Sequence, residues 1–283
     1  MSSRTNPRSE RFTRDPLDGV NLHAMHWGQP GKPLVILLHG GGANVHWWDH
    51  IAPELAEHRH IVALDFRGHG DSDYPENYVT GAFNQDLEAL CHHLGQDKMT
   101  FIAHSMGAQV VLDHASRFDL TQGIMLIDPA RGTQKRTRRA ARLALSLART
   151  YATKEEAMDR FQFVPIAEHV AEPLRRHIAS HSVRLQENER WGFKFDGHWF
   201  GVPPRPKPDL KRVQCPCLVI RGAESELLSS EGASELCAEL PHGRTLEIMR
   251  SGHHVLLDRP DELIVAAQSF LSEISPREKF VNT

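Results

Sequence analysis

The chain has 283 residues, of which 40% are hydrophobic, with 33 Lys and Arg against 36 Asp and Glu. This length suits one large domain or two small ones, and it needs neither disulfides nor a metal to fold. The formal net charge of -3 argues against nucleic acid as a partner, and no apolar run is long enough to cross a bilayer. The polar N-terminus does not resemble a secretory signal, so we expect a cytoplasmic protein.

Short apolar runs alternate with longer segments of helical spacing, which is typical of a parallel sheet with crossover helices. Residues 1–10 are predicted to be disordered, and Phe12 with residues 20–27 to form an antiparallel hairpin at the sheet edge. Residues 34–38 are apolar throughout, which indicates a strand buried on both faces. Further strands are expected at residues 61–64, 101–103, 124–127, 218–220 and 245–249.

The strand rhythm breaks over residues 130–213. Residues 131–190 are rich in Arg, Ala, Leu and Glu at helical spacing, with no strand-like run. Its end, residues 201–208, is a proline-rich segment typical of an extended tether. We therefore predict a helical cap at 130–213, inserted into a core formed by residues 11–129 and 214–275.

The spacing of cysteines and histidines does not indicate a metal site. The four cysteines form no Cys-x-x-Cys pair, and Cys215 and Cys217 lead into an apolar run, which is typical of buried thiols. His46 and His50 have the spacing of a helical ligand pair but lack the glutamate of the His-Glu-x-x-His pattern. We therefore expect no metal and no cofactor.

The segment 99–108 carries the strongest chemical signal. An apolar run leads into Ser105, which has the small residues Ala103 and Gly107 two positions away on either side, and a helical stretch follows. A serine on such a sharp turn projects its hydroxyl, and bulky residues at the flanking positions would collide as strand and helix close up. A helix N-cap role is the alternative, and it explains Ser105 alone.

Four motifs, taken in chain order, resemble those of the α/β-hydrolase family. Residues 39–42 (His-Gly-Gly-Gly) resemble its oxyanion loop, and residues 65–72 its D-x-R-G-x-G-x-S turn. Residues 103–107 resemble its G-x-S-x-G turn, with Ala in place of the first Gly, and residues 252–260 its histidine loop. The resemblance covers nearly all of the chain after residue 10. It implies an α/β fold with a mostly parallel eight-stranded sheet flanked by helices.

The resemblance also implies roles for particular residues. Ser105 would attack a carbonyl, and it needs an imidazole to accept its proton. His253 and His254 both compete for this role, and His253 is favoured because the family's base directly follows a glycine. Backbone N–H groups of Gly41 and Met106 would hold the oxyanion.

The acid of the triad is open between two positions. In many relatives it follows the seventh strand, three residues after a glycine, where this chain has Ser225, with Glu224 and Glu226 each one residue out of register. Asp128 ends the strand predicted after the one that carries the serine, and some α/β-hydrolases take the acid from there. We favour Asp128, with Glu226 second, although a turn or a helix cap would also explain Asp128.

Other residues near these motifs have weaker signals. Asp65 is expected to tie down its turn through Arg67 or backbone N–H groups. Trp47 and Trp48 could line the pocket or pack beneath the cap. A basic run in the cap could favour an anionic substrate, although a solvated helix face is the simpler account. The run comprises Arg131, Lys135, Arg136, Arg138, Arg139 and Arg142.

Together these features predict a serine hydrolase that cleaves a carboxylic ester, lactone or related acyl bond through Ser105, His253 and Asp128. Carbon–carbon or amide hydrolysis by the same triad is one alternative. A receptor that keeps the fold without catalysis is the other, from a different class of function. The expected partner is a small acyl substrate, with neither nucleic acid nor membrane, and the chain is expected to be a monomer or homodimer.

Overall fold

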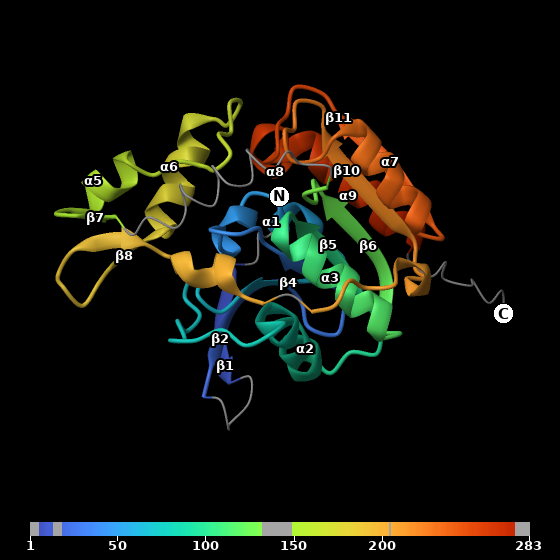
Figure 1. The fold of residues 1–283 in the computed structure, drawn as a ribbon, viewed down its shortest axis with the longest axis horizontal. Coiled ribbons are helices and arrows are strands. Elements are labelled where there is room, and N and C mark those ends of the chain that lie inside the picture. Colours follow the sequence, from blue (N-terminus) through green and yellow to red (C-terminus); the bar gives the residue numbers. More distant parts are fainter. Residues whose placement is uncertain (1–5, 14–18, 132–148, 204, 275–283) are drawn as a thin grey trace.

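The computed structural model describes residues 6–13, 19–131, 149–203 and 205–274 (Figure 1). Its core is an eight-stranded sheet of order β1-β2-β4-β3-β5-β6-β10-β11. β2 runs antiparallel to both of its neighbours, and the other pairings are parallel. The strands are β1 (Arg8–Thr13), β2 (Asn21–Gly28), β3 (Leu34–Leu38), β4 (His60–Asp65), β5 (Met99–His104), β6 (Thr121–Ile127), β10 (Cys217–Gly222) and β11 (Gly243–Ile248). The predicted fold class is confirmed.

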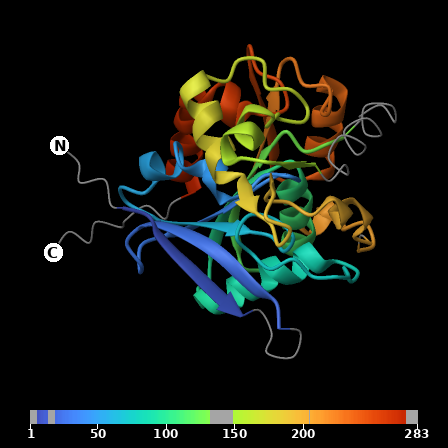
Figure 2. The ribbon, with the colours of Figure 1, turned by 90° about the vertical axis from the view of Figure 1, so that its left-hand side faces the viewer.

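The central strands separate two hydrophobic layers. In β3, Leu34, Ile36 and Leu38 face one layer, whereas Val35 and Leu37 face the other. This is why the run is apolar throughout, since each fully buried aliphatic side chain stabilises the fold by roughly 1.5–3 kcal/mol. The first layer is covered by α2 (Ala82–Leu94), α3 (Met106–Arg117) and α7 (Ser230–Glu239), and the second by α1 (Ala52–Leu55), α8 (Val255–Asp258) and α9 (Pro260–Ile274). In Figure 2 the teal helix α2 lies below the sheet and the red helices lie above it.

The N-terminal hairpin begins earlier than the sequence predicted. β1 starts at Arg8 and pairs antiparallel with β2, whereas residues up to 10 were expected to be disordered. Its first residues are polar and exposed, so they carry no hydrophobic signal. An edge strand is held instead by main-chain hydrogen bonds to its neighbour, which any residue except proline can donate.

The region predicted as a helical cap contains strands as well. Its described part holds α5 (Lys154–Asp159) and α6 (Glu172–His181) beside a small sheet of order β7-β9-β8 (Figure 1, yellow). The prediction that residues 131–190 contain no strand is therefore wrong. The strands are only two or three residues long, too short for a periodic pattern: β7 (Thr150–Tyr151), β8 (Val183–Leu185) and β9 (Trp191–Phe193).

The inserted region packs over the loops that follow the sheet's strands. Phe195 forms a β-bridge with His69, which follows β4, and the amide of Gly70 donates to the carbonyl of Lys194 at 2.8 Å. His254, which follows β11, donates through Nε2 to the carbonyl of Pro165 at 2.8 Å. The insert therefore covers the carboxyl edge of the sheet, where open α/β sheets bind ligands. None of the helices in the described ranges is long and apolar enough to span a membrane.

Acid is expected to destabilise the fold because several histidines are buried without charge. Burial lowers the pKa of His69 to about 3 and those of His26 and His114 to about 4. Burial also holds the pKa of His104 and that of His254 well below the usual 6.5. Between those values and 6.5 the unfolded chain binds more protons than the folded one. Each of the three histidines with a pKa of about 3 or 4 therefore costs about 1.4 kcal/mol of stability for every pH unit of acidification in this range.

Urea unfolding measured between about pH 7 and pH 4.5 checks this. The free energy of unfolding should fall steadily as the pH drops below about 6.5. In the His114→Gln variant this fall should be smaller by about 1.4 kcal/mol per pH unit, the contribution of one histidine. A free energy of unfolding that stays constant over this range would contradict the expectation.

Candidate active site

Ser105, His253 and Asp128 lie in one hydrogen-bonded chain at the carboxyl edge of the sheet. Ser105 directly follows β5, Asp128 directly follows β6, and His253 lies in the loop after β11. His253 Nε2 is 2.9 Å from Ser105 Oγ, and His253 Nδ1 is 2.7 Å from Asp128 Oδ1. The imidazole is thus placed to accept the serine's proton on one nitrogen while the carboxylate accepts a hydrogen bond from the other.

The turn at Ser105 has the strained backbone that the sequence indicated. Ser105 has φ 50° and ψ -108°, a combination that L-residues rarely adopt. Its amide donates to the carbonyl of Ile127 at 3.0 Å, which ties the turn to β6. A Cβ on Gly107 would lie 2.8 Å from Leu38 Cβ and 2.8 Å from the Leu38 carbonyl oxygen. Only glycine therefore lets α3 approach the end of β3 this closely.

Asp128 is held by more than His253. It is fully buried, its Oδ2 accepts from the amide of Gly222 at 3.0 Å, and its Oδ1 accepts from Ser225 Oγ at 2.6 Å. Ser225 Oγ in turn accepts from the amides of Leu227 and Leu228 at 3.1 and 3.2 Å. Since both lone pairs of this hydroxyl are occupied, its proton is directed at Asp128.

The structure places the other acid candidates away from His253. Glu226 is exposed, and so is Glu224, which forms an ion pair with His169 at 3.0 Å. The sequence placed Ser225 in the register of the usual acid but carried no signal that its hydroxyl would bind the acid from another strand. A Cβ on Gly222 would lie 2.0 Å from the carbonyl oxygen of Gly252, so this glycine allows the loop after β10 to meet the histidine loop.

Gly41 and Met106 both line the same cavity as Ser105. Met106 is the first residue of α3, so its N–H has no acceptor within the helix. The glycine loop is braced by His39, which donates through Nδ1 to the Gly40 carbonyl at 2.7 Å and accepts through Nε2 from the amide of Phe66 at 3.1 Å. Burial lowers the pKa of His39, which favours this neutral form.

The cavity beside Ser105 measures about 520 Å³, within the range of small-molecule sites. Its walls are mainly apolar, and the insert supplies part of them through Val164, Pro165, Trp199 and Phe200. Trp199 packs directly on the glycine loop, because a Cβ on Gly41 would lie 2.0 Å from its Cη2. The remaining lining residues are Gly40, Ala43, Trp47, His104, Gln109, Ala130, Leu227, His253 and His254.

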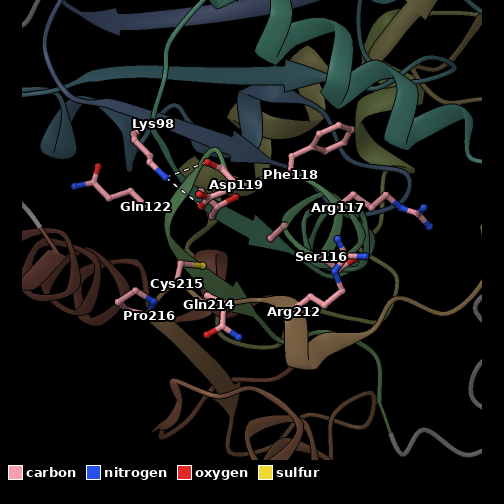
Figure 3. Close-up of a pocket in the computed structure, with 12 residues that line it drawn as sticks. Lys98, Ser116, Arg117, Phe118, Asp119, Gln122, Arg212, Gln214, Cys215 and Pro216 are labelled. Atoms are coloured by element: carbon pink, nitrogen blue, oxygen red, sulfur yellow. Dashed lines mark hydrogen bonds and ion pairs between the residues drawn. The ribbon is translucent and has the colours of Figure 1, made fainter.

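A second hollow, of about 630 Å³, lies at the opposite, amino edge of the sheet (Figure 3). Lys98 precedes β5 there and forms an ion pair with Asp119 at 3.2 Å, drawn as a dashed line. Cys215 and Arg212 lie across the hollow from this pair. None of the three residues of the hydrogen-bonded chain lines it, so the chemistry points to the cavity at Ser105.

The sequence model of the alpha/beta hydrolase family matches residues 35–267. The chain belongs to the α/β-hydrolase family. The matched range includes Ser105, Asp128 and His253 as well as the glycine loop and the insert.

Relatives of this α/β-hydrolase carry names of esterases and other hydrolases. It is 29% identical to Esterase Rv0045c of Mycobacterium tuberculosis over 88% of this chain and 86% of that protein. It is 25% identical to (E)-2-((N-methylformamido)methylene)succinate hydrolase of Acinetobacter baylyi over 85% and 90%. The crystal structure of E-2-(acetamidomethylene)succinate hydrolase matches with a TM-score of 0.81 and 19% identity, covering 94% of this chain and all of that one.

In this α/β-hydrolase, Asp65 is a buried anchor for the loops on either side of it. It accepts hydrogen bonds from His23 Nδ1 at 2.7 Å and from the amides of Val45 and Asp71 at 2.8 and 3.0 Å. Burial raises the pKa of Asp65, but these donors outweigh it and the net shift is downward. The prediction that Arg67 or backbone N–H groups hold Asp65 is confirmed for the backbone N–H groups. Arg67 pairs instead with Asp86, which the sequence did not single out.

Three other expectations concern aromatic, histidine and basic residues. Trp47 lines the cavity, whereas Trp48 is fully buried. His46 bonds Asp49, and His50 bonds the carbonyl of Leu256. Of the basic run, Arg131 forms an ion pair with Glu239, and the other five members lie outside the described residues.

Proposed function

We propose that this α/β-hydrolase is a serine hydrolase that cleaves carboxylic esters or closely related acyl bonds. The observation that carries the proposal is the continuous chain from Ser105 Oγ through His253 to Asp128, with heavy-atom distances of 2.9 and 2.7 Å. The serine lies on a strained turn, and its hydroxyl is within hydrogen-bond reach of an imidazole that a carboxylate orients. Nucleophilic acyl transfer requires this arrangement.

In the proposed reaction Ser105 Oγ attacks the substrate carbonyl while its proton passes to His253 Nε2. Asp128 stabilises the imidazolium that forms, and the amides of Gly41 and Met106 donate to the oxyanion. The oxyanion then collapses, His253 protonates the departing alcohol, and an acyl-enzyme remains on Ser105. A water molecule that loses its proton to His253 attacks the acyl carbon, and the acid product leaves as Ser105 regains its proton.

The residues that line the cavity indicate which kind of acyl group it would accept. Among the lining residues that the structure describes there is no Lys or Arg. Aromatic and aliphatic side chains such as Trp47 and Leu227 would therefore favour a neutral, apolar acyl group of small size. The relative named as an esterase supports the ester bond as the target.

Amide cleavage is the second candidate. One relative is named for a substrate that carries an N-methylformamido group, which is an amide. The same serine, histidine and oxyanion donors would serve this bond, and His253 would then protonate a departing nitrogen instead of an oxygen.

Labelling with a fluorophosphonate, followed by peptide mass spectrometry, tests the proposal together with turnover of p-nitrophenyl acetate and butyrate. We expect a single adduct on Ser105 in native protein, none in heat-denatured protein, and turnover of both esters. A matched set of p-nitroanilides measures amide cleavage. Absence of both labelling and turnover would overturn the proposal. Ligand-induced stabilisation without product would then support a non-catalytic receptor.

A further inference from the structure

Three histidine rings lie together in the lining of the cavity beside Ser105. The ring centroids of His104 and His253 are 4.7 Å apart, those of His253 and His254 are 5.0 Å apart, and those of His104 and His254 are 5.5 Å apart. All three side chains are buried, and one ring nitrogen from each lies within 4.8 Å of one from each of the others. The proposed reaction uses only His253.

The other two rings each leave one nitrogen without a partner. His104 donates through Nε2 to the carbonyl of His253 at 3.1 Å, and His254 donates through Nε2 to the carbonyl of Pro165 at 2.8 Å. In a neutral ring Nδ1 then carries a lone pair, and no group among the described residues donates to either one.

Both unpartnered Nδ1 atoms are buried. At His104 the backbone of Gly40 lies against Nδ1, because a Cβ on Gly40 would lie 2.7 Å from it. Both histidines line the cavity beside Ser105. A buried acceptor that receives no hydrogen bond is costly to the fold, and a bound cation would satisfy both of these nitrogens.

We propose that His104, His253 and His254 form a binding site for a borderline divalent cation of the Zn²⁺, Ni²⁺ or Cu²⁺ type. Neutral imidazoles are the ligands such cations favour, with metal–nitrogen distances of about 2.0–2.1 Å, which a small inward rotation of the rings would supply. The hydrogen bond of 2.7 Å from His253 Nδ1 to Asp128 is the outer-shell contact that orients a metal-binding imidazole. Water or Ser105 Oγ, which lies 2.9 Å from His253 Nε2, would supply the fourth ligand.

A cation at this site blocks acyl transfer. It occupies His253 Nε2, the nitrogen that would accept the serine's proton, so metal binding and catalysis exclude each other. This consequence rests on the proposed function, whereas the site itself does not.

The experiment measures metal binding directly. Chelator-treated full-length protein is titrated with Zn²⁺ by calorimetry and with Co²⁺ by visible absorption. We expect one high-affinity ion per chain and the intense visible bands of tetrahedral Co²⁺. The Ser105→Ala variant should bind as well as wild type, since water replaces the hydroxyl. This arm gives the same answer whether or not the protein hydrolyses esters.

His254→Phe and His254→Gln remove one ligand. Loss of an outer-shell partner alone costs about 10- to 100-fold in affinity, so each variant should lose at least about tenfold. Phe suits the aromatic packing of His254 against Trp47 and Phe163, and Gln keeps a polar side chain, so two different replacements guard against misfolding. Thermal unfolding verifies that each variant is folded.

The matched control is His169→Ala. His169 belongs to an exposed group with Glu168 and Glu224 that could also bind a cation. Unchanged affinity in both folded His254 variants would overturn the proposal, as would loss of binding in His169→Ala or no binding by wild type. In wild type, Zn²⁺ should also protect Ser105 from the fluorophosphonate, and a chelator should restore labelling.

Discussion

The Ser105→Ala variant is expected to lose about five to six orders of magnitude in kcat, with little change in KM. The variant removes the only atom that could form the acyl-enzyme in the proposed reaction, while the cavity and the amides of Gly41 and Met106 stay in place. Any rate that the variant keeps above uncatalysed hydrolysis in water would come from oxyanion stabilisation and substrate binding alone. Stopped-flow and steady-state assays with p-nitrophenyl butyrate measure the loss, and fluorophosphonate labelling should disappear with it.

The matched control for this variant is Ser116→Ala. Ser116 is a buried serine of α3 whose hydroxyl donates to the carbonyl of Asp113 at 2.8 Å, and it lines the hollow at the other edge of the sheet. The Ser116→Ala variant should have the same activity and the same fluorophosphonate labelling as wild type. A Ser105→Ala protein that is folded and keeps more than about one hundredth of the wild-type kcat would show that another nucleophile acts.

The Asp128→Asn variant is expected to lower kcat by about 10⁴-fold. An amide at this position no longer stabilises the imidazolium, and its NH₂ group turned toward His253 Nδ1 would select the wrong tautomer. The same exchange weakens the hydrogen bonds from Ser225 and from the amide of Gly222. Kinetics of Asp128→Asn beside Glu226→Gln measure the effect, and Glu226→Gln should retain wild-type activity because that side chain is exposed.

Ser225 allows a second test of which carboxylate orients His253. Its Oγ lies 2.6 Å from the oxygen of Asp128 that bonds His253, so a carboxylate at position 225 would come close to the same imidazole nitrogen. The double variant Asp128→Asn, Ser225→Asp should therefore recover at least about tenfold over Asp128→Asn alone. Collapse of Glu226→Gln together with an active Asp128→Asn would instead identify Glu226 as the acid.

Features that depend on neighbours along the chain could be predicted from the sequence. A strand buried on both faces must be apolar at every position, so β3 could be predicted from Leu34–Leu38 alone. The turn at Ser105 needs small residues at fixed offsets, and Ala103 and Gly107 satisfy that need locally. Where the local signal was weak, prediction failed: β1 has polar residues at its start, and β7 has only two residues.

The side chains that meet at the carboxyl edge of the sheet come from distant parts of the chain. Asp128 and His253 lie 125 positions apart in the chain, and Ser225 lies 97 positions from Asp128. No local pattern encodes such contacts, because they depend on the order β5-β6-β10-β11 that places the ends of these strands side by side. The pairing of Ser225 with Asp128, and the free nitrogens of His104 and His254, follow from that strand order and from burial, which act only once the chain has folded.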